Sequence, residues 1–324
     1  MPRHARIDLP GLLQHVIVRG IERRKIFFDD IDREDLVARL SNLLGETQTV
    51  CYAWALLDNH FHLLLMPTQI SLAVIMRRLL TGYAVSFNLR HKRAGHLFQN
   101  RYKSLVCDEN SYLLELIRYI HLNPIRAGII SDTASLEGYP WAGHQQMLGS
   151  GRFKLVADGD VLSLFSHNKS TARKAYRQFV ADGLKDDIPK LSRGGRSTSC
   201  LLDQNLRDDG QFDDRILGGG LLVERVLGAA DAVGQAKSDS LEELIGVIAD
   251  YFGLDASQLQ FPSKQRRLVR AKAVICFVAV RYYHQPGNQV AQRLGYSSSA
   301  VSRAVERGRV VFNDCCDLRM LVTK

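Results

Sequence analysis

The feature that most limits how this chain can fold is a pair of apolar segments joined by a short turn. Residues 47–57 are rich in Thr, Val, Tyr and Trp, and residues 60–66 continue as a second apolar segment. Asp58-Asn59 between them is a turn signal, and Pro67 ends the second segment. This pattern predicts an antiparallel β-hairpin and therefore a sheet.

The segments around this hairpin predict a domain of mixed strands and helices. Further strands are predicted at residues 12–20 and 101–107, and helices at residues 32–44, 71–89 and 111–122, the last ended by Asn123-Pro124. The order is strand, helix, strand, strand, helix, strand, helix. It indicates an α+β fold with a ferredoxin-like antiparallel sheet and helices on one face, in a first domain at residues 1–150.

The rest of the chain predicts helices and loops without strands. A helix is predicted at residues 170–184 and a loop at residues 192–211, so residues 151–239 are interpreted as a helical connector and linker. Residues 240–324 predict an all-α domain, with helical segments at 240–252, 268–283, 289–294 and 298–310.

Composition excludes several classes of protein. With 46% hydrophobic and 24% charged residues, the chain has a globular composition. Its longest apolar run, Ala273 to Val280, is far shorter than the roughly 20 residues of a membrane span. The first residues lead into no apolar signal core, and the six cysteines form no Cys-x-x-Cys pair. We therefore expect a cytoplasmic protein with reduced thiols and no membrane partner.

Positive charge is concentrated in two zones. The net charge is +9, and residues 264–309 contain ten Lys or Arg and one acidic residue. Residues 77–103 contain seven Lys or Arg and no acidic residue. Two separate basic zones predict a polyanion partner, most simply nucleic acid, and hence an association with the nucleoid. Solvated helix faces are the alternative interpretation.

The hairpin carries the motif His60-Phe61-His62. Residues i and i+2 of a strand share a face, so both imidazoles point the same way and make a platform for a divalent metal. The alternative is two polar residues on an exposed sheet face. Downstream, Tyr119 and Asn123 lie one helical turn apart and so share a face. Alternatively, Tyr119 is a core residue and Asn123 only stops the helix before Pro124.

Taken together, these residues make a coherent chemical hypothesis. A metal held by His60, His62 and Asn123 could polarise a phosphate, and Tyr119 could attack the phosphorus to form a phosphotyrosine. A cleft lined by basic residues would hold the DNA strand. The candidates for this role are Arg77, Arg78, Arg101 and Lys103.

Three motifs resemble those of the single-tyrosine HUH transposases, and most of all the REP-associated tyrosine transposases. They are residues 54–65, which contain the histidines, residues 95–104 and residues 118–128, which contain Tyr119. The resemblance implies a Mg²⁺ or Mn²⁺ site at His60 and His62. It also implies a 5′-phosphotyrosine at Tyr119, formed on single-stranded DNA with hairpins such as REP-like repeats. Tyr112, seven residues upstream on nearly the same helical face, is the competing nucleophile.

The all-α domain predicts a helix-turn-helix at residues 288–305, turning at Gly295, with Ser297 or Ser298 as the cap of the second helix. The residues expected to face duplex DNA are Ser298, Ser299, Ser302 and Arg303. Residues 241–311 resemble the C-terminal DNA-binding domain of the replication initiator DnaA, whose basic loop matches Lys264, Arg266, Arg267 and Arg270. The initiator's Asp-His-Thr-Thr segment is here Ser297 to Ala300. A plain helical hairpin is the alternative.

These observations predict a metal-dependent transposase, mobile or domesticated, that nicks single-stranded DNA near hairpins and transfers the strand. It would act as a monomer or homodimer and bind duplex DNA through residues 240–324. Two alternatives stay open. One is a catalytically inert regulator that binds hairpins or duplex DNA, and the other is a rolling-circle-type replication initiator that shares the two histidines.

Overall fold

The computed structural model describes residues 6–185, 194–195, 198–199, 212–283, 285–315 and 318, without the side chains of Asn110 and of residues 233–239. The chain divides into two compact units, residues 1–227 and 228–324. The predicted connector at residues 151–239 spans this division, and most of the loop predicted at residues 192–211 lies outside the described residues. No described helix combines the length and the apolarity needed to cross a membrane.

The first unit is built on one sheet in the order β2-β3-β1-β4-β5. Its strands are β1 (Leu13–Arg19), β2 (Val50–Leu57), β3 (His60–Met66), β4 (Lys103–Cys107) and the short β5 (Ile216–Leu217). The first four pair antiparallel, whereas β5 pairs parallel to β4. The order of β1 to β4 is that of a ferredoxin-like sheet, so the predicted α+β class is confirmed.

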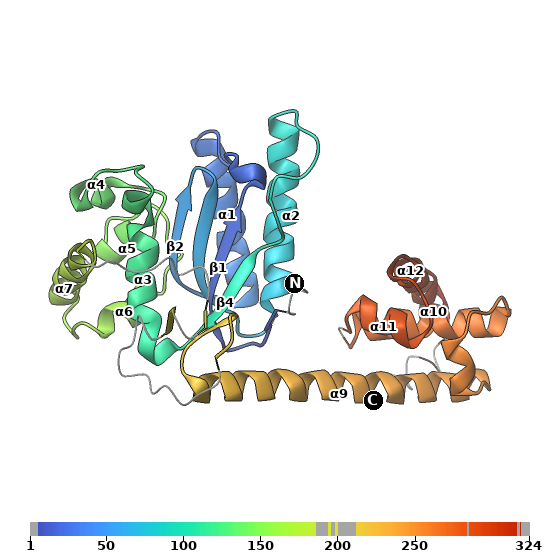
Figure 1. Ribbon diagram of the computed structural model, residues 1–324. Helices are drawn as coiled ribbons and strands as arrows, with labels where there is room; N and C mark the ends of the chain where they lie inside the picture. Colours follow the sequence, from blue (N-terminus) through green and yellow to red (C-terminus); the bar gives the residue numbers. More distant parts are fainter. Residues whose placement is uncertain are drawn as a thin grey trace. The chain divides into compact units, whose positions relative to one another are not determined.

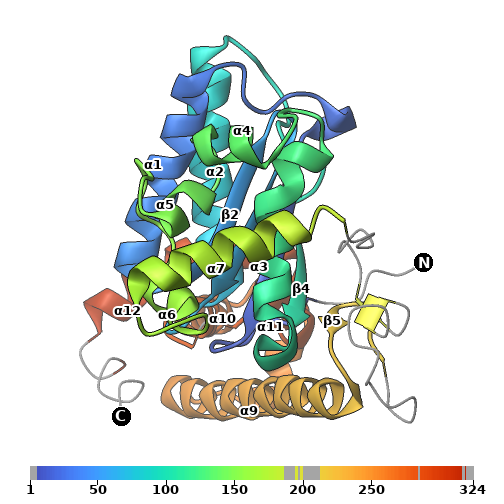
Figure 2. The same cartoon turned by 90° about the vertical axis from the view of Figure 1, so that its left-hand side faces the viewer.

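Helices cover both faces of this sheet. The helices α1 (Asp30–Thr47) and α2 (Leu72–Arg90) lie on one face, as the ferredoxin-like prediction expects. The helix α3 (Glu109–Arg126) lies on the opposite face, as the two views agree (Figures 1 and 2). This differs from the expectation of helices on one face only. The reason is burial: almost every residue of β2 and β3 is buried, so both of their faces need a cover.

α3 continues for four residues beyond its predicted end at residue 122. The sequence predicts a stop at Asn123-Pro124, but the helix includes Pro124 and ends at Arg126. A proline removes a single N–H donor and already has a helical φ, and Pro124 is buried at the end of an otherwise intact helix. The turn that ends the helix lies further on, at Gly128, which has a positive φ of 69°.

Beyond residue 126 the first unit adds short helices to the α3 side of the sheet. They are α4 (Thr133–Gly138), α5 (His144–Leu148), α6 (Asp158–Ser163) and α7 (Lys169–Asp182). Tyr176 and Val180 of α7 belong to the same hydrophobic core as Leu116 and Ile120 of α3. Figure 2 shows α7 crossing in front of α3. The chain between residues 151 and 182 thus packs as part of the first unit.

The second unit is helical, as predicted. It contains the end of α9 (Gly220–Phe252), a short 3₁₀ helix (Ala256–Gln260), α10 (Arg266–Arg281), α11 (Gly287–Arg293) and α12 (Ser298–Asp314). α9 begins twenty residues before the helix predicted at 240–252. Ser297 caps α12 by accepting a hydrogen bond from the Ala300 amide. Gly308 lets α12 approach α10, because a Cβ there would collide with the carbonyl oxygen of Ala273.

Candidate active site

Three histidines from the neighbouring strands β1 and β3 meet on one face of the sheet. Ile17 lies opposite His62 and Arg19 opposite His60, so His15, two residues before Ile17, shares their face. The rings of His15 and His62 stack with centroids 5.1 Å apart, and His15 Nε2 lies 2.9 Å from His62 Nδ1. His15 is fully buried and His62 is 4% exposed. The sequence predicted two of these histidines but missed His15.

Each of the two predicted metal ligands is oriented through its Nδ1 atom. His60 Nδ1 lies 2.6 Å from Oδ1 of Asn59, and His62 Nδ1 contacts His15. With Nδ1 engaged, Nε2 is the nitrogen that each ring would offer to a metal.

Both rings are held in the neutral form. Burial, followed by the positive charge of Arg19, lowers the pKa of His60 to about 4. Burial, followed by the neighbouring His15, lowers the pKa of His62 well below its usual 6.5. Neutral imidazole is the form that binds a divalent cation, so the pair fits a metal near pH 7. Across the described ranges no group of three or more His, Cys, Asp or Glu is arranged as a metal site, so further ligands would be an amide, water or the substrate.

α3 places Tyr119 against these histidines. Its ring meets His15 and His62 edge-on, with centroid distances of 6.0 and 6.1 Å. The guanidinium of Arg126 lies over the Tyr119 ring, 5.2 Å from the ring centroid. Arg126 thus packs on the face of the Tyr119 ring as a cation–π partner. Tyr119 is 7% exposed, so the site is nearly closed. Arg126 was not predicted, although its spacing of seven residues places it on the helical face of Tyr119.

Asn123 lies one turn after Tyr119 and is folded against its own helix. Its Nδ2 atom donates a hydrogen bond of 2.9 Å to the carbonyl oxygen of Tyr119. Asn123 is 8% exposed. The bond uses the amide nitrogen, so the amide oxygen is the atom that could face a metal.

Tyr112, the competing nucleophile, lies away from the histidines. It is 1% exposed, and its hydroxyl donates to the carbonyl oxygen of Ser199 at 3.3 Å. Seven helical residues separate Tyr112 from Tyr119, which is about 10 Å along the axis. The geometry therefore favours Tyr119.

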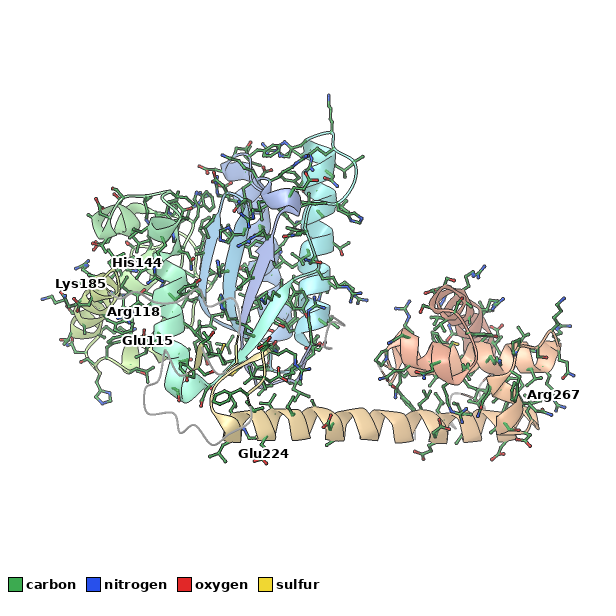
Figure 3. All side chains as sticks on the ribbon, viewed as in Figure 1. Glu115, Arg118, His144, Lys185, Glu224 and Arg267 are labelled. Atoms are coloured by element: carbon green, nitrogen blue, oxygen red, sulfur yellow. The ribbon has the colours of Figure 1, made fainter. Side chains whose placement is uncertain are left out.

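A buried polar network fixes the helix that carries Tyr119. His121 of α3 and His144 of α5 both contact the hydroxyl of Tyr176 on α7, at 2.7 and 3.0 Å from their Nδ1 atoms. All three are buried, so His121 is structural and does not reach a substrate. Figure 3 labels His144 beside α3, together with Arg118 and Glu115, which form an ion pair on that helix.

The structure separates the basic residues predicted in the first domain. Lys103 lies opposite Ile17 and so shares the face of His62, and Arg101 is exposed just before it. Arg77 and Arg78 are exposed on α2, which covers the other face of the sheet (Figure 2). Arg78 also forms an ion pair with Glu46. The four residues therefore do not line one cleft.

In the second unit all the predicted DNA-binding side chains are exposed: Lys264, Arg266, Arg267, Arg270, Ser298, Ser299, Ser302 and Arg303. Other basic residues of the same segment are not available to a ligand. Lys272 is buried and donates to the carbonyl oxygens of Phe261 and Leu294, both at 2.8 Å. Arg293 forms an ion pair with Glu242.

Comparison with known proteins bears on this site. Residues 9–123 match the family model described as IS200-like transposase. A search of the curated proteins found no match. Among solved structures, one described as a REP-associated tyrosine transposase bound to a REP hairpin is similar, with 14% identity and a TM-score of 0.39. The similarity covers 48% of this chain and 90% of that chain.

The family match covers the part of the chain that builds the site. It includes β1 to β4, the three histidines, Tyr119 and Asn123. It does not extend to the second unit. The similarity to the IS200-like transposase family is therefore confined to residues 9–123, the part of the chain that builds the site.

Proposed function

We propose that this protein cuts and rejoins single-stranded DNA beside hairpins, with Tyr119 as the nucleophile. The observation that carries the proposal is the packing of Tyr119 against His62, on a sheet face that also holds His15 and His60. A phenol beside two neutral imidazoles is the arrangement needed for metal-assisted attack on a phosphate. The preference for hairpins rests on the resemblance of the three sequence motifs.

The proposed reaction has two steps that reverse each other. Tyr119 Oη forms a bond to phosphorus while the bond from phosphorus to the 3′-oxygen of the preceding nucleotide breaks. The phenolic proton leaves Oη, and the departing 3′-oxygen takes up a proton, which gives a 3′-hydroxyl and a 5′-phosphotyrosine. Attack by another 3′-hydroxyl then rejoins DNA without an external energy source, because the phosphotyrosine conserves the bond.

His60 and His62 are the proposed metal ligands, with the amide oxygen of Asn123 as a third. A bound divalent ion supplies polarisation of the scissile phosphate. A set of two nitrogens and one oxygen suits Mn²⁺ better than Mg²⁺, which prefers oxygen ligands. His15 would act on His62 as a positioning residue, since a proton held on His62 Nδ1 by this contact would leave Nε2 of His62 for a metal.

We assign duplex binding, for example to a hairpin stem, to the second unit. The support is the exposed basic and serine side chains of α10 and α12 and of the segment just before α10. The turn at Gly295 joins α11 to α12, and Gly295 has a positive φ of 63°.

The test is a covalent adduct on labelled single-stranded hairpin DNA with Mn²⁺, resolved on a denaturing gel. Wild type, Tyr119→Phe and Tyr112→Phe are compared. We expect the adduct to disappear only in Tyr119→Phe. Loss only in Tyr112→Phe would keep the reaction and correct the residue. Tight binding without any adduct in wild type would identify an inert DNA-binding protein instead.

A further inference from the structure

Beside His60 the first unit has an open pocket, and His60 is the only one of its lining residues to which the proposed chemistry gives a role. Its volume is about 240 Å³, and Arg19, Arg23, Asn59 and His60 line it. This is smaller than the roughly 300–1,000 Å³ of pockets for drug-sized ligands, so it suits one chemical group of a larger molecule. Arg19 shares the sheet face of His60, which joins the pocket to the site of Tyr119.

The main chain holds the walls of this pocket in place. Asn59 Nδ2 donates to the carbonyl oxygen of Arg23 at 3.0 Å, and Asn59 Oδ1 contacts His60. The amide of Gly20 donates to the carbonyl oxygen of Asn59 at 2.9 Å. Gly20 has no room for a side chain, because a Cβ there would collide with the carbonyl oxygen of Arg24. The turn that carries Arg23 is therefore tied to the turn of the β2–β3 hairpin.

The positive charge of the pocket is not neutralised. Neither Arg19 nor Arg23 forms an ion pair with a carboxylate in the described part of the chain, and both are exposed. The nearby acids are already paired with other cations. Glu22 lies 2.7 Å from Arg24, and Asp58 binds Lys25 at 2.8 Å and Arg33 at 2.9 Å.

We propose that this pocket binds a phosphodiester of the single DNA strand, next to the linkage that Tyr119 attacks. Two guanidinium groups without a carboxylate partner, lining one pocket with the side-chain amide of Asn59, suit the oxygens of a phosphate. His60 lines the pocket and packs on His62, which packs on Tyr119, so a phosphate bound in the pocket would neighbour the scissile one. The inference rests on the proposed function for the identity of the strand, and it adds Arg19 and Arg23 as residues that align it.

The experiment uses full-length protein with Tyr119→Phe, so that the DNA stays intact, and hairpins with a single-stranded flank. In each hairpin one phosphate of the flank is replaced by an uncharged methylphosphonate. With Arg19 intact, one or two positions should weaken binding by roughly ten-fold, the loss expected for one charge-assisted hydrogen bond. In Arg19→Ala a methylphosphonate at these same positions should weaken binding little further. At all other positions it should change binding as it does with Arg19 intact. The same pattern is expected for Arg23→Ala.

The matched control is Arg24→Ala. Arg24 belongs to the same turn, but it pairs with Glu22 and does not line the pocket. It should leave the methylphosphonate pattern unchanged. The proposal would be overturned if Arg19→Ala and the methylphosphonate weakened binding independently of each other at every position of the flank. So would a pocket that binds inorganic phosphate in an Arg19-dependent way without any position-specific effect on DNA.

The outcome is separable from that of the proposed chemistry. An adduct in wild type without position-specific coupling at Arg19 would refute phosphate binding in the pocket and leave Tyr119 as the nucleophile. Coupling at Arg19 without an adduct in wild type would support phosphate binding in the pocket and refute the proposed cleavage reaction.

Discussion

The two units present their candidate residues in opposite ways. In the first unit the site consists of buried side chains, with His15, His62 and Tyr119 each at most 7% exposed and locked by contacts with one another. In the second unit the candidates are exposed side chains on helices and the preceding segment, while Lys272, which is buried, has a structural role. The first arrangement suits chemistry that needs fixed geometry, and the second suits attraction to many phosphates. Single changes should therefore act steeply in the first unit and gradually in the second.

The largest effect is expected from His62→Ala. Removing a metal ligand takes away several kcal/mol of transition-state stabilisation, so adduct formation should fall by roughly a thousand-fold. Binding of the hairpin should stay within about two-fold, because phosphate contacts dominate affinity. Single-turnover adduct formation and fluorescence anisotropy on the same hairpin measure the two quantities.

His15→Phe is the graded counterpart. It removes the partner of His62 Nδ1 but keeps a ring under Tyr119, so Mn²⁺ affinity by calorimetry should fall by roughly 10–100-fold. Unchanged Mn²⁺ affinity in His15→Phe would refute the positioning role. Adduct formation at the wild-type rate in His62→Ala would refute the metal site itself.

The sequence predicted the elements that this site needs, because each has a local signal. The alternation around His60-Phe61-His62 defines a strand, and the spacing of Tyr119 and Asn123 defines a helical face. His15 has no such signal. Its role depends on the register of β1 against β3, which pairs residues almost fifty positions apart and which no local pattern reveals.

Other differences have the same origin in tertiary contacts. α7 packs on α3 because the hydroxyl of Tyr176 contacts His121 and His144. Local sequence patterns predict the helices that carry these residues, but they do not predict this contact between helices. The extension of α9 to Gly220 follows from the packing of Leu222, Val223 and Val226 on Ile216. The predicted charge pattern treats residues 264–309 as about ten available cations, but burial of Lys272 and the pairing of Arg293 reduce that number.

Acid should destabilise the first unit more than the second. Burial lowers the pKa of His60 and of His144 to about 4, and it holds the pKa of His62 and of His121 well below the usual 6.5. The unfolded chain binds these protons near pH 6.5, so stability is complete above that pH and is lost as the pH falls toward 4. Each fully buried histidine contributes up to about 1.4 kcal/mol per pH unit in this window.

The two tryptophans make this measurable in metal-free protein. Trp54 and Trp141 both belong to the first unit, whereas the second unit has no tryptophan and one histidine, His284. Urea unfolding followed by tryptophan fluorescence should shift to lower urea between pH 7 and pH 5. Circular dichroism records the helices of both units, so its midpoint should shift less than that of the fluorescence. Equal shifts of both signals would show that the buried histidines do not control acid stability.

The smallest effect is expected in the second unit, from Arg267→Ala. Arg267 is exposed near the start of α10 (Figure 3), and it is one of several cations rather than a fixed part of a site. Loss of one phosphate contact should lower the slope of log affinity against log salt by about 0.9 for duplex DNA and weaken binding only a few-fold. The control is Arg293→Gln, whose charge is already paired with Glu242, and it should leave the slope unchanged. Equal slopes for Arg267→Ala and wild type would mean that this face does not contact the duplex. A hundred-fold loss of affinity would mean that the second unit, like the first, has a site of fixed geometry.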